Sequence, residues 1–337
     1  MLCPRCHELC QEQGCQRCGW KRPLTADPFS NTPFPALPAR RSAGSFVVNE
    51  GAAPLEVGAL LRGGSYRLTE RLSQQTWLPG VCETIWLAED SKHYNALVRL
   101  CEVALPEKDR ASRRALFFAA TRTLHAAGKH PHLPALLDIF EEKERGFFVF
   151  ERVEGESLLA RMRRIKRVLS EQEVIDCCLQ VVDVLEYLAQ QSPPVVHGLI
   201  QPANILLGRT NGRYMLTNGS IILATRAARY SADVSRAQLS PYAAPEFGRG
   251  PVNASADLYA LVATAYSLAT GLLPVKQSGI IPPARQFNPN LSPQLETILA
   301  RGLYSGLGLR PDTSLRYQRP AELRWDILTT CVFTPVG

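Results

Sequence analysis

Hydrophobic and polar residues alternate along the first patterned part of the chain, and helical periodicity follows. Alternation with a period of two predicts strands, and apolar residues recurring every three or four positions predict helices. Strands are predicted at residues 66–72, 83–89, 95–103, 136–142 and 146–153. Helices are predicted at residues 110–127, 157–167, 170–190, 254–270, 292–303 and 320–329. This order predicts an α+β fold with two lobes that join near residues 151–155.

The most apolar stretch, residues 258–274, contains Tyr, Ser and Thr and is short for a membrane span, so it predicts a buried helix. The first residues carry charge and cysteines instead of the apolar core of a signal peptide. The chain has 337 residues with 38 Lys and Arg against 31 Asp and Glu, a net charge of +7. This mild excess permits an acidic partner without requiring nucleic acid. We therefore expect a cytoplasmic protein without a membrane span.

Five of the ten cysteines lie within the first 18 residues. Four of them form two C-x-x-C pairs, which are Cys3, Cys6, Cys15 and Cys18. Two such turns supply four thiolates in a tetrahedral arrangement, for which Zn²⁺ is the usual occupant. The spacing therefore predicts a zinc ribbon, with two disulfides or an iron site as the alternatives. Cys10 and His7 lie within the same segment, and either could replace one of the four ligands.

The predicted ribbon spans residues 1–22 and is too short to bury a core, so the bound metal must supply its folding energy. Residues 23–63 are rich in proline with interspersed Gly and Ser, which predicts a semi-extended linker. The ribbon resembles short zinc ribbons at the ends of many bacterial and archaeal proteins. Residues 64–332 form the main body.

Several short motifs follow one another in a fixed order within this body. They lie at residues 84–90, 96–99, 130–133, 197–207, 244–246, 257–261 and 316–318. Residues 197–207, HGLIQPANILL, align without a gap to the pattern H-R-D-L-K-P-x-N-I-L-L, and residues 244–246 read A-P-E. The ordered set resembles the bacterial Ser/Thr protein kinases. The resemblance implies a bilobal protein-kinase-like fold, with a five-stranded N-lobe carrying one helix (64–152) and a mostly helical C-lobe (156–332).

The resemblance assigns structural roles to four residues that this chain retains. His197 corresponds to the motif histidine beneath the catalytic loop, and Asp257 to the aspartate that accepts hydrogen bonds from that loop. Glu246 and Arg316 correspond to the ion pair that ties the activation segment to the C-lobe. Ala96 is matched to the residue that packs on adenine.

The groups that perform phosphoryl transfer are replaced. Arg99 stands at the position of the phosphate-binding lysine, Leu199 at that of the catalytic aspartate, and Asn218 at that of the metal-binding aspartate. Asn204 does match the metal-binding asparagine. Residues 73–82 contain a single glycine, and no acidic residue occurs from 119 to 121 or from 187 to 232. Loss of a general base alone lowers a rate by roughly 10²–10⁴-fold.

These losses predict a pseudokinase that regulates or scaffolds other proteins, with an active kinase or a phosphoprotein as a candidate partner. Zinc is the expected cofactor, and ATP with Mg²⁺ is not expected. A divergent kinase or other phosphotransferase, in which Asn204 and Asn218 hold a metal, is the alternative. A zinc-ribbon nucleic-acid adaptor ranks last, because residues 1–22 hold four Lys or Arg against two Glu.

Two basic features remain open. Residues 161–167 carry five basic residues and no acidic one. They are interpreted first as the solvated face and end of a helix, and otherwise as a docking site for an acidic partner or a membrane surface. The second feature is a group of arginines near the lost metal site that could form an anion pocket: Arg209, Arg213, Arg226 and Arg229.

Overall fold

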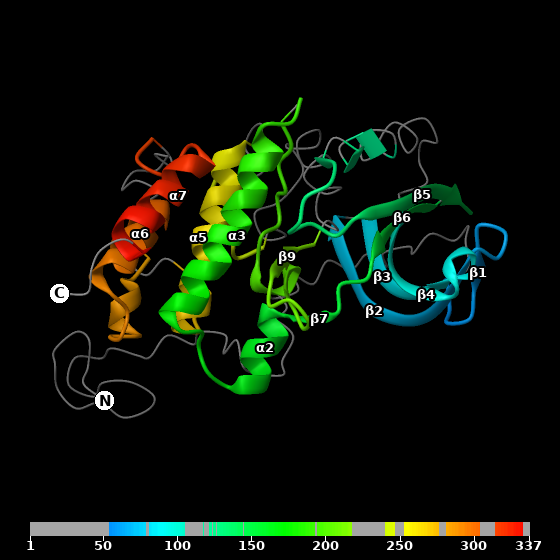
Figure 1. Ribbon diagram of the computed structural model, residues 1–337, viewed down its shortest axis with the longest axis horizontal. Coiled ribbons are helices and arrows are strands. Elements are labelled where there is room, and N and C mark those ends of the chain that lie inside the picture. The colour runs from blue at the N-terminus through cyan, green and yellow to red at the C-terminus, as the bar shows by residue number, and fades with distance from the viewer. Residues whose placement is uncertain are drawn as a thin grey trace, which may run out of the picture.

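The computed structural model consists of two lobes, one built on a sheet and one on helices (Figure 1). It describes residues 54–78, 81–104, 121–122, 124–125, 127–143, 145–192, 194–217, 240–246, 253–275, 281–303 and 314–332, together with residue 117. The sheet lobe contains strands β1 to β6, and the helical lobe follows from β7 onward. The expected α+β fold is therefore observed, and the predicted zinc ribbon lies outside the described residues.

The sheet of the first lobe is antiparallel throughout, in the order β1-β2-β3-β4-β6-β5. Its strands are β1 (Leu60–Leu61), β2 (Tyr66–Leu78), β3 (Val81–Asp90), β4 (Ala96–Ala104), β5 (Leu136–Glu142) and β6 (Arg145–Glu151). The five predicted strands correspond to β2–β6.

The strand β1 corrects the predicted start of the body at residue 64. Leu61 pairs with Tyr66 and is fully buried beneath the sheet. Leu55 and Ala59 pack against the same cluster. Part of the segment that we assigned to the linker therefore belongs to the folded lobe. Two residues are too few to show an alternating pattern, so only burial reveals this strand.

The two faces of the sheet pack against different hydrophobic cores. Trp86, Leu100 and Val149 belong to a small core on the outer face. Cys101 and Phe148 lie on the inner face and join the main core that continues into the helical lobe. Residues 117, 121–122, 124–125 and 127 are helical, and the rest of the helix predicted at 110–127 lies outside the described residues.

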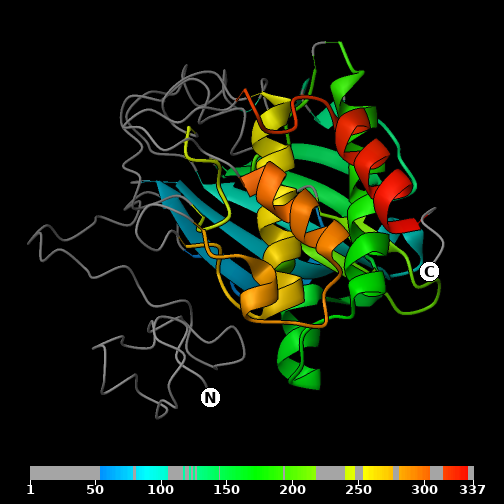
Figure 2. The ribbon, with the colours of Figure 1, turned by 90° about the vertical axis from the view of Figure 1, so that its left-hand side faces the viewer.

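The helices of the second lobe match their predicted ranges to within a few residues. They are α2 (Leu158–Ile165), α3 (Glu171–Ala189), α5 (Ala254–Thr270), α6 (Pro293–Leu303) and α7 (Pro320–Ile327), which continues as a π-helical turn, Leu328–Val332. In Figure 2, α3, α5, α6 and α7 stand together in front of the sheet. The Ser170 hydroxyl caps the start of α3 by accepting a hydrogen bond from the N–H of Glu173, and the Glu173 carboxylate accepts one from the N–H of Ser170.

Helix α5 lies at the centre of this lobe and is buried on all sides. Its residues from Ser255 to Ala269 are buried, which explains why the segment is apolar around its whole circumference. The prediction of a buried helix in this stretch is confirmed. None of the helices in the described ranges combines the length and the hydropathy needed to cross a bilayer.

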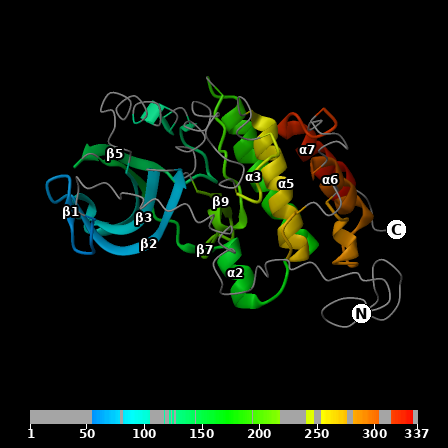
Figure 3. The same cartoon turned by 180° about the vertical axis from the view of Figure 1, so that it is seen from behind.

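A second, small sheet sits where the lobes meet (Figure 3). Its strands are β7 (Gly155–Ser157), β8 (Ile205–Gly208) and β9 (Tyr214–Leu216), in the order β7-β8-β9. The sequence did not predict them, because three- and four-residue strands are shorter than the window that reveals periodicity. Strand β8 directly follows the loop 194–204, which contains the short 3₁₀ turn Pro202–Asn204.

Helix α6 packs closely on α5 at Gly302. A Cβ atom added there would lie 2.5 Å from Cγ2 of Val262. We expect Gly302→Ala to lower the free energy of unfolding by about 1–2 kcal/mol, because overlap with Val262 outweighs the gain in helix propensity. Urea unfolding of the single variant and of Gly302→Ala with Val262→Ala tests this. The prediction is contradicted if Gly302→Ala is as stable as the wild type. It is also contradicted if Gly302→Ala costs as much unfolding free energy in the presence of Val262→Ala as in its absence.

Candidate functional site: the loop and strands between the lobes

The carboxylate of Asp257 holds the loop 194–204 through hydrogen bonds to its backbone. Asp257 in the first turn of α5 accepts hydrogen bonds from the backbone N–H groups of His197 and Gly198, both at 2.7 Å. Asp257 is almost completely buried. Burial raises the pKa of Asp257 to about 6, although the two hydrogen bonds lower it. The carboxylate is therefore ionised at pH 7 and fixes the start of the loop.

His197 is fully buried and links the loop to the end of β9. Its Nε2 atom lies 2.7 Å from the carbonyl oxygen of Thr217, which can only accept a hydrogen bond, so Nε2 carries the proton. Nδ1 then accepts a hydrogen bond from the N–H of Leu199 at 3.4 Å. Burial lowers the pKa of His197 to about 4, so the ring is neutral at pH 7. These contacts give His197 a structural role.

Leu199 lies at the centre of this framework. Its side chain is buried and apolar, so it can neither take up a proton nor bind a cation. Nδ2 of Asn204 donates to the carbonyl oxygen of Leu199 at 2.9 Å, which braces the loop from within. The N–H of Thr217 in turn donates to the carbonyl oxygen of Asn204 at 3.0 Å. These hydrogen bonds hold the loop in place around Leu199, whose side chain has no acid–base or metal-binding group.

On the sheet side, three residues share the inner face of β3 and β4. The Cys101 thiol donates a hydrogen bond to Oε1 of Glu83 at 3.1 Å, and both side chains are buried. Burial lowers the pKa of Arg99, and the negative charge of Glu83 acts in the opposite direction. Cys101 and Glu83 therefore partly offset the effect of burial on the pKa of Arg99. The sequence analysis did not identify Glu83, because only strand pairing shows that it lies opposite Val103, on the face that also carries Cys101 and Arg99.

The alternation of β4 separates Ala96 from Arg99. The two residues are three positions apart and so lie on opposite faces of the strand. Ala96 is exposed and shares its face with Val98 and Leu100, which belong to the outer core. The structure therefore places Ala96 away from the inner face, and Leu97 is the neighbour that shares the face of Arg99.

A buried ion pair anchors residues 240–246. The Arg316 guanidinium pairs with Oε1 of Glu246, and it lies 5.1 Å from the ring centroid of Tyr259. The Arg316 side chain is 1% exposed, whereas that of Glu246 is 30% exposed. Ser240 also donates a hydrogen bond to Oε1 of Gln201 at 2.9 Å, which ties this segment to the loop.

The family model of the protein kinase domain matches residues 106–292, which is more than half of the chain. The chain belongs to this family. Pkn1, a serine/threonine-protein kinase of Myxococcus xanthus, is 29% identical over 261 residues, covering 72% of this chain and 36% of Pkn1. Serine/threonine-protein kinase B of Synechocystis is 29% identical over 168 residues, covering 47% of this chain and 29% of that kinase. The chain thus spans about a third of these relatives' length.

Solved structures show the same fold. The kinase domain of Mycobacterium tuberculosis PknI superposes with a TM-score of 0.60 at 23% identity, and the alignment covers 82% of this chain and all of that domain. The apo form of PpkA-294 gives a TM-score of 0.63 at 16% identity, covering 82% of this chain. Both comparisons support the bilobal kinase fold expected from the motifs.

Within this kinase-family chain, the structure brings most of the predicted positions together around the loop and the inner sheet face. The retained structural residues make the contacts described above: His197, Glu246, Asp257 and Arg316. Arg99 lies on the inner face of the sheet and Leu199 in the loop, whereas Asn218 lies outside the described residues. The predicted cysteine ligands Cys3, Cys6, Cys15 and Cys18 also lie outside them, as do Arg226 and Arg229. Among the described residues, no group of three or more His, Cys, Asp or Glu could hold a metal ion.

Proposed function

We propose that this chain is a catalytically inactive member of the protein kinase domain family that acts as a regulatory or scaffolding module for other proteins. The observation that carries the proposal is the catalytic-type loop itself. Asp257, His197 and Asn204 retain the contacts that hold the loop, whereas the residue that they present is Leu199. Such a loop supports an interaction surface and has no group to position a hydroxyl nucleophile.

The inner face of the sheet supports the same proposal. In phosphoryl transfer, the cationic side chain at the position of Arg99 contacts the phosphates, so its acidic partner must leave it free to do so. Here the Glu83 carboxylate already lies within electrostatic reach of Arg99. A bound triphosphate would have to approach this buried carboxylate, and like charges repel strongly where water is excluded. Arg99 is therefore suited to stabilise the sheet and poorly suited to bind phosphates.

Label transfer from ATP and calorimetry test the proposal on the full chain. No ³²P is expected in the protein or in a generic acceptor, and Leu199→Asp with Asn218→Asp should remain inactive because the glycine loop is also absent. ATP titrated with Mg²⁺ and again with EDTA should give no heat, or the same heat in both.

Mg²⁺-dependent turnover that Asn204→Ala abolishes would overturn the proposal. That result would favour the divergent phosphotransferase, in which Asn204 and Asn218 hold the metal.

The zinc ribbon is proposed as the second contact site of this module, on the basis of the cysteine spacing alone. We expect about one zinc per chain by elemental analysis. Cys3→Ser with Cys18→Ser should lower the zinc content to near zero, because a closed tetrahedral site needs all four ligands. Cys10→Ser is the matched control and should retain one zinc. A pure protein without metal would contradict the prediction, and loss of zinc in Cys10→Ser would make Cys10 a ligand.

A further inference from the structure

A cavity of about 430 Å³ lies in the helical lobe among β7, the turn from β8 to β9, and α2. One part of its lining is bare backbone at Gly155, Gly208 and Gly212. A Cβ on Gly155 would lie 2.3 Å from the carbonyl oxygen of Leu207, so this wall can be built only with glycine. Gly212 has a φ of +63° and open space before it, which allows a ligand to come close to the backbone.

The rest of the lining is dominated by positive charge. Arg161 and Arg164 project from α2, and Arg209 projects from the turn after β8. Glu156 is the single carboxylate of the lining, and Glu173 pairs with Arg161 from outside it. Together with Arg167, which also pairs with Glu173, the cavity and its ion pairs hold four arginines against two carboxylates, an excess of +2. Arg209 is exposed, and no carboxylate within the described part of the chain pairs with it.

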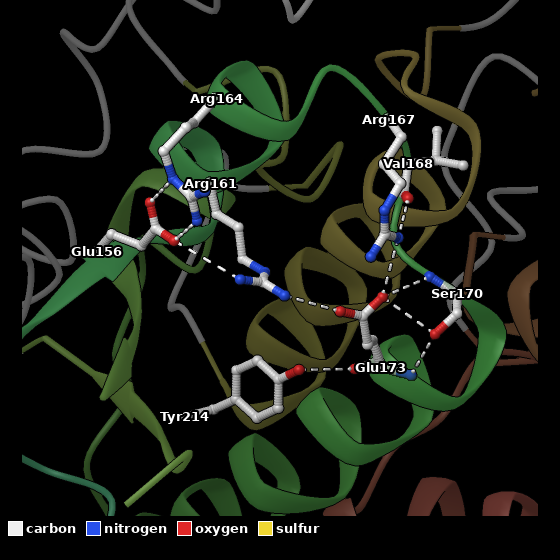
Figure 4. A network of polar contacts seen from close by, with 8 residues as sticks. All are labelled: Glu156, Arg161, Arg164, Arg167, Val168, Ser170, Glu173 and Tyr214. Atoms are coloured by element: carbon white, nitrogen blue, oxygen red, sulfur yellow. Dashed lines mark hydrogen bonds and ion pairs between the residues drawn. The ribbon is translucent and has the colours of Figure 1, made fainter. Parts of the chain in front are cut away.

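Two of the arginines are held in place by a ladder of ion pairs (Figure 4). Glu156 accepts hydrogen bonds from Arg164, with Nε at 3.0 Å, and its Oε1 atom lies 3.6 Å from Arg161. The other end of the Arg161 guanidinium donates to Glu173 at 3.0 Å, and Glu173 also pairs with Arg167 at 3.2 Å. The guanidinium groups are therefore oriented before any ligand arrives, which reduces the entropy lost on binding.

The carboxylates of this ladder stay ionised. Burial would raise the pKa of Glu173, but hydrogen bonds from Ser170, Arg161 and Arg167 outweigh it and lower the pKa to about 2. The hydrogen bond and charge of Arg164 likewise lower the pKa of Glu156. The ladder thus keeps its geometry throughout the physiological pH range.

We propose that this cavity binds a phosphate monoester carried by a protein partner, that is, a phosphorylated serine or threonine. Guanidinium forks match the oxygens of a phosphate and bind it in pairs, and a dianion would neutralise the excess of +2. A concave cavity with a glycine wall fits a single compact group, whereas a membrane surface would need a convex basic face. The inference extends the proposed interaction module and does not depend on the loss of catalysis.

Binding to the full chain would be measured with a degenerate phosphoserine and phosphothreonine peptide library, its unphosphorylated counterpart and inorganic phosphate. We expect retention of the phosphorylated library alone, with inorganic phosphate as a competitor. Arg209→Gln with Arg164→Gln should weaken the binding of a selected phosphopeptide at least tenfold. Arg213→Gln with Lys166→Gln is the matched control, because it removes the same charge outside the lining and should change the affinity less than twofold.

Misfolding of a variant would also weaken phosphopeptide binding, so a variant that is expected to bind more tightly serves as a control. Glu156→Gln removes the negative charge that repels a phosphate and keeps an amide oxygen that accepts a hydrogen bond from Arg164, so it should bind the phosphopeptide more tightly than the wild type. The inference is overturned if the two libraries bind equally or if both charge-removing variants weaken binding alike. It is also overturned if vesicles containing phosphatidylserine bind while the phosphorylated library does not. Because these measurements use neither ATP nor turnover, their failure leaves the proposed loss of catalysis untouched.

Discussion

Replacing Asp257 with alanine is expected to lower the free energy of unfolding by about 2–4 kcal/mol. The substitution leaves the buried N–H groups of His197 and Gly198 without an acceptor, and each such group costs about 1–3 kcal/mol. Relief from burying a carboxylate offsets part of this cost. Urea unfolding at pH 7, followed by circular dichroism, measures the change.

The pH dependence separates the charge of Asp257 from its hydrogen bonds. Its pKa is raised from 3.8 to about 6 in the folded state, so the native protein holds the proton more tightly than the unfolded chain. The stabilisation from this protonation is fully present below about pH 4 and is lost as the pH rises through 6. Asp257→Asn cannot ionise, so its unfolding free energy relative to that of the wild type should increase as the pH rises from about 4 through 6. An alanine variant within 1 kcal/mol of the wild type would show that the loop is anchored elsewhere.

Glu246→Gln is the second substitution with a large expected effect, about 2–4 kcal/mol of unfolding free energy. It leaves the Arg316 guanidinium charged in a site where the side chain is 1% exposed, with the Tyr259 ring as a remaining partner. Breaking a buried ion pair from one side strands the other charge away from water, and that stranded charge is the main cost. Urea unfolding at pH 7 measures the loss.

The two halves of this pair should not be equivalent. Arg316→Met leaves Glu246 behind, and that side chain is 30% exposed and can be hydrated, so the loss should be smaller. The double variant Glu246→Gln with Arg316→Met should recover much of the stability lost in Glu246→Gln, because no buried charge remains. Equal losses in the two single variants, or a double variant less stable than Glu246→Gln, would contradict this account.

The helical lobe could be predicted closely, whereas the small sheet could not. The prediction of residues 254–270 as a helix agrees with α5 to the residue, because the apolar run, the Asn253 cap and Gly271 at its end are all local signals. Strands β7, β8 and β9 are three or four residues long, and long-range pairing alone defines them. Strand β1 is also too short to be recognised from periodicity, so the folded body was predicted to begin only at residue 64.

The interpretation of residues 161–167 as a solvated helix end was incomplete. Arg161 and Arg164 line a cavity together with Arg209, which lies 45 or more positions further along the chain. Arg209 itself was grouped with Arg213, Arg226 and Arg229 near the lost metal site. The structure instead places it beside α2. No local pattern could show this, because the strand β8 that carries the turn is brought there by pairing with β7.

The sequence by itself determined the family and the chemical groups that are missing. The motifs are contiguous, so a leucine at position 199 or an asparagine at 218 is visible in the order of residues alone. The tertiary structure decided which polar groups meet: Glu83 with Cys101 across two strands, Glu246 with Arg316, and three arginines around one cavity. Electrostatic and hydrogen-bonding partners depend on distance in space, and only the packed chain sets those distances.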